Sequence, residues 1–149
     1  LTVPLQIVEF YLILAAITVV STGLFVRLMG ASVLMLVFGF FGELGIAPMI
    51  MGVIALLFWV YIIYEVFAGE ASKINAASGS AASQTAFSAL RLIVTIGWAI
   101  YPIGYFLGVG ESGSADALNI IYNLADFVNK IAFGVVIWAA ATSDSKATA

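Results

Sequence analysis

The stretch that decides the fold is YNLADFVNKIAFG, residues 122–134, which lies in a long apolar run near the end of the chain. It carries Asp126 and Lys130, four residues apart. In a helix this spacing places both side chains on one face, one turn from each other. The run is apolar enough to cross a membrane, and a charged pair inside such a segment needs a specific reason.

The composition indicates a membrane protein. Of the 149 residues, 64% are hydrophobic and 9% are charged, and the mean hydropathy is +1.18, whereas soluble proteins are about one quarter charged. The chain contains no cysteine and no histidine, which excludes disulfides, thiolate catalysis and the usual zinc or haem ligation within it. We expect no metal site and no nucleic-acid partner.

Five apolar runs approach the length of about 20 residues that a transmembrane helix needs. They cover residues 1–22, 27–42, 46–67, 85–107 and 117–141. The second run is short and would cross with little tilt or in a thin region of the bilayer. Residues 142–149 are expected to form a C-terminal tail, and the chain is expected to begin inside a helix, with further membrane segments upstream. The predicted fold is an all-α membrane bundle.

Basic residues predict the orientation, because lysine and arginine are retained on the cytoplasmic side of short loops. With five alternating spans, four bases fall on one face and three acids on the other: Arg27, Lys73, Arg91 and Lys146 against Glu43, Glu111 and Asp116. The C-terminus is therefore expected in the cytoplasm. Glu65 and Glu70 lie near a helix end on the basic face, and we expect them to be surface charges.

Lys130 is the fifth base and lies near the middle of its span, too far from either end for its side chain to reach water. A lysine at the bilayer centre costs at least about 2.5 kcal/mol, so it should face the bundle interior, with Asp126 as its counter-charge. One interpretation is an inert ion pair that fixes helix packing. The other is covalent, because an amine in an apolar pocket attacks aldehydes and the resulting iminium needs a nearby carboxylate.

A flat conjugated aldehyde would need an aromatic slot, and GWAIYPIGYF, residues 97–106, supplies one. Trp98, Tyr101, Pro102 and Tyr105 follow the i, i+3, i+4, i+7 spacing of one helix face. Taken alone, such a stripe is also typical of a packing surface. Pro102 favours a kink, which could act as a hinge for opening the cytoplasmic side.

These two motifs together resemble the last two helices of the microbial rhodopsins, and EFYLILAA, residues 9–16, with YNLADFVNK is similar to the proteorhodopsins in particular. The resemblance runs over essentially the whole chain. It implies a seven-helix retinal-binding bundle, of which this chain would supply helices three to seven. It implies a membrane transport protein and not an enzyme.

The resemblance also implies roles for individual residues. Lys130 would hold retinal as a protonated Schiff base, and Asp126 would be one of its counter-ions. The pocket would be lined by residues of three spans, for some of which ordinary packing is an alternative: Met35, Gly39, Trp59, Trp98, Tyr101, Pro102 and Tyr105.

Two polar residues of the first span complete the expected site. Glu9 occupies the position of the proton donor between the Schiff base and the cytoplasm; a packing or interfacial acid is the alternative. Gln6 occupies a position that carries leucine in green-absorbing proteorhodopsins and glutamine in blue-absorbing ones. The resemblance thus implies a blue-absorbing pigment, although an amide that pairs with a neighbouring helix would fit as well.

The implied function is a light-driven outward proton pump in a bacterial inner membrane, with retinal as cofactor and protons as cargo. The family's main proton acceptor, an aspartate, would lie upstream of residue 1, so a pump for another ion or a photosensor is an alternative. A non-photochemical proton-coupled transporter that uses Asp126, Lys130 and Glu9 as a relay is a second alternative. A purely structural bundle is a third, and a homo-oligomer is compatible with all of them.

Overall fold

The computed structural model describes residues 2–78, 80–109 and 115–147, and all of the regular elements in these ranges are helices. The elements are α1 (Thr2–Ile17), α2 (Thr22–Glu43), α3 (Pro48–Phe67), α4 (Glu70–Ser78), α5 (Ala81–Leu92), the π-helix η1 (Ile93–Gly97), α6 (Ile100–Val109) and α7 (Ala115–Ala147). Four helical stretches are long and apolar enough to cross a membrane, and Val3–Ile17 is a shorter apolar helix. The predicted all-α membrane bundle is confirmed for this part of the chain.

Several helices extend beyond the residue ranges that were predicted for them from the sequence. α2 begins at Thr22, because the Ser21 side chain accepts a hydrogen bond of 3.2 Å from the Leu24 N–H and so caps the helix. It has 22 residues, so the second span is not short. The stretch between the third and fourth predicted spans contains α4, and α7 continues to Ala147 through most of the expected tail.

The fourth expected span, 85–107, is interrupted rather than continuous. α5 passes into η1, where the Trp98 N–H donates a 3.1 Å bond to the Ile93 carbonyl five residues earlier, the pattern of a π-helix. The Tyr101 N–H then bonds the Trp98 carbonyl at 3.1 Å. Pro102 lacks an N–H and its ring crowds the carbonyl four residues earlier, which is that of Trp98. The irregular stretch therefore lies just before Pro102.

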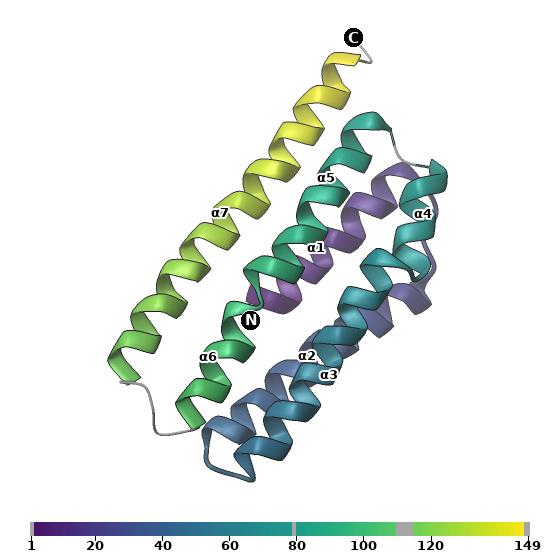
Figure 1. The fold of residues 1–149 in the computed structure, drawn as a ribbon. Coiled ribbons are helices and arrows are strands. Elements are labelled where there is room, and N and C mark those ends of the chain that lie inside the picture. The colour runs from purple at the N-terminus through teal and green to yellow at the C-terminus, as the bar shows by residue number, and fades with distance from the viewer. Residues whose placement is uncertain (1, 79, 110–114, 148–149) are drawn as a thin grey trace.

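The helices pack as two groups that share one core. α2 and α3 form an antiparallel pair, and α7 packs mainly against α5, η1 and α6, with α1 packed against both α2 and α5 (Figure 1). The Phe10 and Phe87 rings meet edge to face at 4.8 Å between centroids. Many large apolar side chains face outward, which suits a chain whose surroundings are lipid tails as apolar as leucine.

At the end of the bundle that carries α4, Glu65 is buried, with only 5% of its surface exposed. The expectation of a surface charge is therefore wrong for this residue. Its carboxylate accepts hydrogen bonds from the Tyr61 hydroxyl at 3.0 Å and the Glu70 N–H at 2.9 Å. Arg27 lies 3.6 Å away and also pairs with Glu70. Buried charge is tolerated here because these donors satisfy it.

Candidate functional site

The centre of the candidate site is a chain of three polar side chains. Lys130 of α7 forms an ion pair with Asp126, one turn earlier in the same helix. Tyr101 of α6 donates a hydrogen bond to the other oxygen of that carboxylate. The carboxylate is thus held between an amine and a phenol, and all three groups can hold or transfer a proton.

The ion pair is half-buried: 34% of the Lys130 side chain and 43% of the Asp126 side chain are exposed. The sequence predicts a more interior position for both. The difference arises because α7 packs mainly against α5, η1 and α6 and leaves its other side open. Only 6% of the most apolar stretch of α7 is buried against the rest of the chain.

A cavity of about 530 Å³ lies beside this chain of side chains; we call it the central cavity. Asp126 contributes to its wall. The wall also contains all seven residues that the sequence placed in a pocket: Met35, Gly39, Trp59, Trp98, Tyr101, Pro102 and Tyr105. The structure therefore brings together side chains from α2, α3, α6 and α7 that lie far apart in the sequence.

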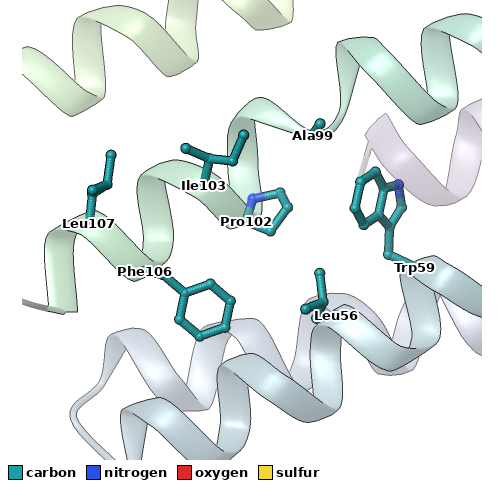
Figure 2. A pocket seen from close by; sticks show the side chains of 7 residues that line it. All are labelled: Leu56, Trp59, Ala99, Pro102, Ile103, Phe106 and Leu107. Atoms are coloured by element: carbon teal, nitrogen blue, oxygen red, sulfur yellow. The ribbon is translucent and has the colours of Figure 1, made fainter.

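Trp59 extends from α3 toward α6 and forms part of two cavities. Its indole N–H donates a 3.0 Å hydrogen bond to the Val94 carbonyl of η1. Figure 2 shows the second cavity, of about 480 Å³, where Trp59 and Leu56 face Pro102 and its neighbours on α6. This second cavity is apolar and has no titratable side chain in its wall, so the chemistry of the site belongs to the central cavity.

Tyr105 fixes one side of the central cavity through close backbone approach. Its hydroxyl donates a 2.7 Å hydrogen bond to the Pro48 carbonyl at the start of α3. A Cβ added at Gly42 or Gly52 would overlap the Tyr105 side chain. Glycine at these two positions lets α2 and α3 approach the ring.

The two residues of the first span are placed differently from each other. Gln6 is buried, with 7% of its surface exposed, and its side-chain nitrogen has no hydrogen-bond partner among the described residues. Glu9 is exposed, and neither residue lies in the wall of the central cavity. Ile7 and Phe10 face the core, and Glu9 lies about 200° around the helix from Ile7, so it points away from that core.

Among the residues that sequence reasoning missed at the site, four are polar. Glu43, Tyr122 and Asn123 lie in the wall of the central cavity, and Asn129 donates a 2.9 Å hydrogen bond from its amide to the Gly97 carbonyl. Tyr122 had a signal, because it precedes Asp126 by one helical turn. Asn129 had none, since its partner is a backbone atom of another helix.

These contacts describe an integral membrane protein with a helical bundle. A carboxylate in the wall of its aromatic cavity is paired with a lysine and accepts a hydrogen bond from a tyrosine. The chain belongs to the bacteriorhodopsin-like protein family, whose model matches residues 1–144. The resemblance to the microbial rhodopsins is therefore confirmed.

Individual relatives agree with this assignment. The chain is 54% identical over 148 residues to the green-light absorbing proteorhodopsin of Gamma-proteobacterium EBAC31A08. It is 50% identical over 149 residues to the blue-light absorbing proteorhodopsin of Gamma-proteobacterium Hot 75m4, and in both cases 97% of this chain and 59% of the relative are covered. The crystal structure of blue light-absorbing proteorhodopsin from Med12 matches with a TM-score of 0.79 and 50% identity, covering 96% of this chain and 63% of that one. The chain thus spans about three-fifths of the length of these relatives.

Proposed function

We propose that this chain is the retinal-binding part of a light-driven outward proton pump. The observation that carries the proposal is the ion pair of Lys130 and Asp126, because Asp126 lies in the wall of a cavity with aromatic side chains, although Lys130 itself does not line that cavity. A lysine next to a carboxylate can bind an aldehyde and then hold the positive charge of the adduct.

The residues present fit retinal as the cofactor. A volume of about 530 Å³ lies within the range of about 300–1,000 Å³ for small-molecule sites. Gly39 has no atom within 4 Å of the place where a Cβ would lie, and so leaves room in the wall. Lys130 would hold retinal, and the seven wall residues given above would contact it. When bound, retinal supplies the absorption of light and the change of shape that follows.

The chain's own residues would stabilise the positive charge of the adduct and transfer the proton. Asp126 would hold a negative charge beside the Lys130 nitrogen, and Tyr101 would keep the carboxylate in place through its hydrogen bond. Trp98, with 3% of its surface exposed, would exclude water from this end of the cavity. We propose Glu9 as the group that returns a proton from the cytoplasmic side.

The relatives are longer than this chain, and we propose that the remaining segments of the protein complete the bundle. They would cover Glu9 and the open side of α7, and would supply the main proton acceptor. This arrangement would bury the ion pair of Lys130 and Asp126, which is half-buried in the present chain.

We propose a blue-absorbing pigment, because Gln6 places a buried amide at the first span. An amide dipole near the chromophore would stabilise the ground-state charge distribution and widen the optical gap. The side-chain nitrogen of Gln6 has no partner among the described residues, so it is available for such an interaction.

We also propose that the protein lies in a bacterial inner membrane with its C-terminus in the cytoplasm. In Figure 1 the end of α7 lies at the same end of the bundle as α4 and the start of α5. Lys73 belongs to α4, and Arg91, in the last turn of α5, lies 4.8 Å from the ring centre of Phe67, the last residue of α3 before α4. The positive-inside rule then places this end in the cytoplasm.

The test adds all-trans retinal to membranes that contain the protein in its longest natural form. We expect a visible absorption band that Lys130→Ala abolishes and that Lys146→Ala, a change of the exposed lysine on the same helix, leaves intact. In vesicles, light should move protons out of the cytoplasmic side, and a protonophore should abolish the signal. The absence of a band would favour the non-photochemical transporter. A band without proton movement would favour a photosensor or a pump for another ion.

A further inference from the structure

The π-helix η1, which connects α5 to α6, accepts side-chain hydrogen bonds from two other helices. Its π-helix leaves carbonyl groups out of the regular helical pattern. The Val94 carbonyl accepts a 3.0 Å bond from the Trp59 indole of α3. The Gly97 carbonyl accepts a 2.9 Å bond from the Asn129 amide of α7. Side chains of two separate helices thus donate hydrogen bonds to carbonyls of the π-helix.

Asn129 is the more informative of these two donors, because of its neighbours in the chain. It immediately precedes Lys130, and the residue it holds, Gly97, immediately precedes Trp98. Trp98 is buried and lies in the wall of the central cavity. One hydrogen bond therefore connects Asn129, which precedes Lys130, to Gly97. Gly97 in turn precedes Trp98, a residue of the cavity wall.

Gly97 is matched to this contact. A Cβ added at Gly97 would overlap the Asn129 amide, so glycine at this position leaves the space that the amide occupies. The same test finds nothing within 4 Å at Gly134 of α7. A Cβ added at Gly104 of α6 would overlap the Tyr122 side chain of α7. Close approach to α7 therefore occurs at Gly97 and Gly104 and not at Gly134.

We propose that Asn129 is a positioning residue, which acts through Gly97 to place Trp98 against the central cavity. The inference rests on the proposed function, because it assigns a purpose to the placement of Trp98. It does not require Asn129 to contact the chromophore or to carry a proton. A hydrogen bond to an irregular helical segment fixes the orientation of the side chain that follows it, as neighbouring groups around a site commonly do.

The test compares Asn129→Leu, which keeps the side-chain size and removes the donor, with Asn119→Leu, which changes an exposed asparagine of the same helix. The first measurement is the absorption maximum after addition of all-trans retinal to the protein in its longest natural form. The second is backbone hydrogen–deuterium exchange over residues 97–101 in the retinal-free protein. We expect Asn129→Leu to shift the absorption maximum and to speed the exchange about fivefold, and Asn119→Leu to change neither.

A second pair of variants tests the same bond from its other side. Gly97→Ala should give the same direction of spectral shift as Asn129→Leu, whereas Gly134→Ala should give none. The double variant Gly97→Ala/Asn129→Ala should be less perturbed than the sum of its two single changes, because the methyl group fills the space of the lost amide. These variants decide the matter if Asn129→Leu does not fold.

The possible outcomes separate the inference from the proposed function. A visible band with a maximum and an exchange rate that Asn129→Leu leaves unchanged would overturn the inference and leave the pump intact. Strictly additive effects in the double variant would also overturn it. No band in the unsubstituted protein would overturn the pump, and with it the purpose assigned to Asn129, even if the exchange measurement confirmed the bond.

Discussion

The carboxylate of Glu65 caps the helix that follows it in the chain, since it accepts a 2.9 Å hydrogen bond from the N–H of Glu70, the first residue of α4. A carboxylate at a helix N-terminus satisfies a free donor and complements the helix dipole. Tyr61 and Arg27 hold the same carboxylate from α3 and α2. One buried acid therefore ties three helices together at one end of the bundle.

Replacing Glu65 should weaken this end. We expect Glu65→Ala to lower the free energy of unfolding by about 1–3 kcal/mol, because it leaves several donors without their acceptor. Glu70→Ala, a change at a more exposed position, should cost less. Thermal unfolding in detergent micelles measures both, and equal losses would contradict the central role of Glu65.

Gly52→Ala should destabilise the fold by about 1–3 kcal/mol, since the added methyl group would overlap the Tyr105 ring. Gly30→Ala is the matched control, because nothing lies within 4 Å of a Cβ at that position. The measurement is again the unfolding midpoint in micelles. Tolerance of alanine at both positions would show that α3 can move away from Tyr105 at little cost.

Changes around the ion pair should move the colour of the pigment in opposite directions. Asp126→Asn removes a negative charge beside the cationic nitrogen, so the ground state loses stabilisation and the absorption band should move to the red. Tyr101→Phe removes the hydrogen bond that the Tyr101 hydroxyl donates to Asp126. The negative charge is then concentrated on the carboxylate, so the absorption band should move to the blue. Absorption spectra of retinal-loaded membranes test both signs, and shifts in the same direction would contradict this account.

Gln6→Leu should move the absorption band to the red, because it removes the amide dipole that we expect to widen the optical gap. The same change should leave stability nearly unaffected or raise it, since the buried side-chain nitrogen of Gln6 has no partner in the described part of the chain. The absorption spectrum and the unfolding midpoint of one preparation provide both measurements. An unchanged spectrum would remove the basis for assigning a blue-absorbing pigment.

Glu9→Gln should slow recovery of the pigment after a flash by about 100-fold, the scale of a lost general acid. The resting colour should stay the same, because Glu9 is exposed and points away from the core, whereas Gln6 is buried. Flash photolysis measures the recovery, and Glu70→Gln serves as a control of equal charge change. Recovery at the parent rate would exclude Glu9 as the proton donor.

Helical periodicity explains why much of the site was predictable from the sequence. Asp126 and Lys130 do form an ion pair one turn apart, and all four residues of the aromatic motif, from Trp98 to Tyr105, line one cavity. Spacing along a helix determines which side chains share a face. The prediction survives the interruption at η1 because the four residues lie at or beyond its C-terminal end.

Contacts that depend on a distant backbone or on unequal packing were not predictable in this way. The bond from Asn129 to Gly97 joins residues 32 positions apart and leaves no pattern in either segment. From the sequence, Glu65 is expected to be a surface charge near a helix end. Only the structure places Arg27, 38 residues earlier, beside it. The exposure of Glu9 depends on which helices flank α1, and sequence spacing carries no information about that.

The π-helix of residues 93–97 has a consequence for comparison with related chains. It adds one residue to a turn, so every side chain beyond it is rotated by about 100° relative to a regular helix that continues from α5. Removing a single residue from this segment would make the helix more regular and at the same time turn the aromatic side chains of α6 toward the lipid. A relative without this feature would align correctly only with a one-residue gap at this place.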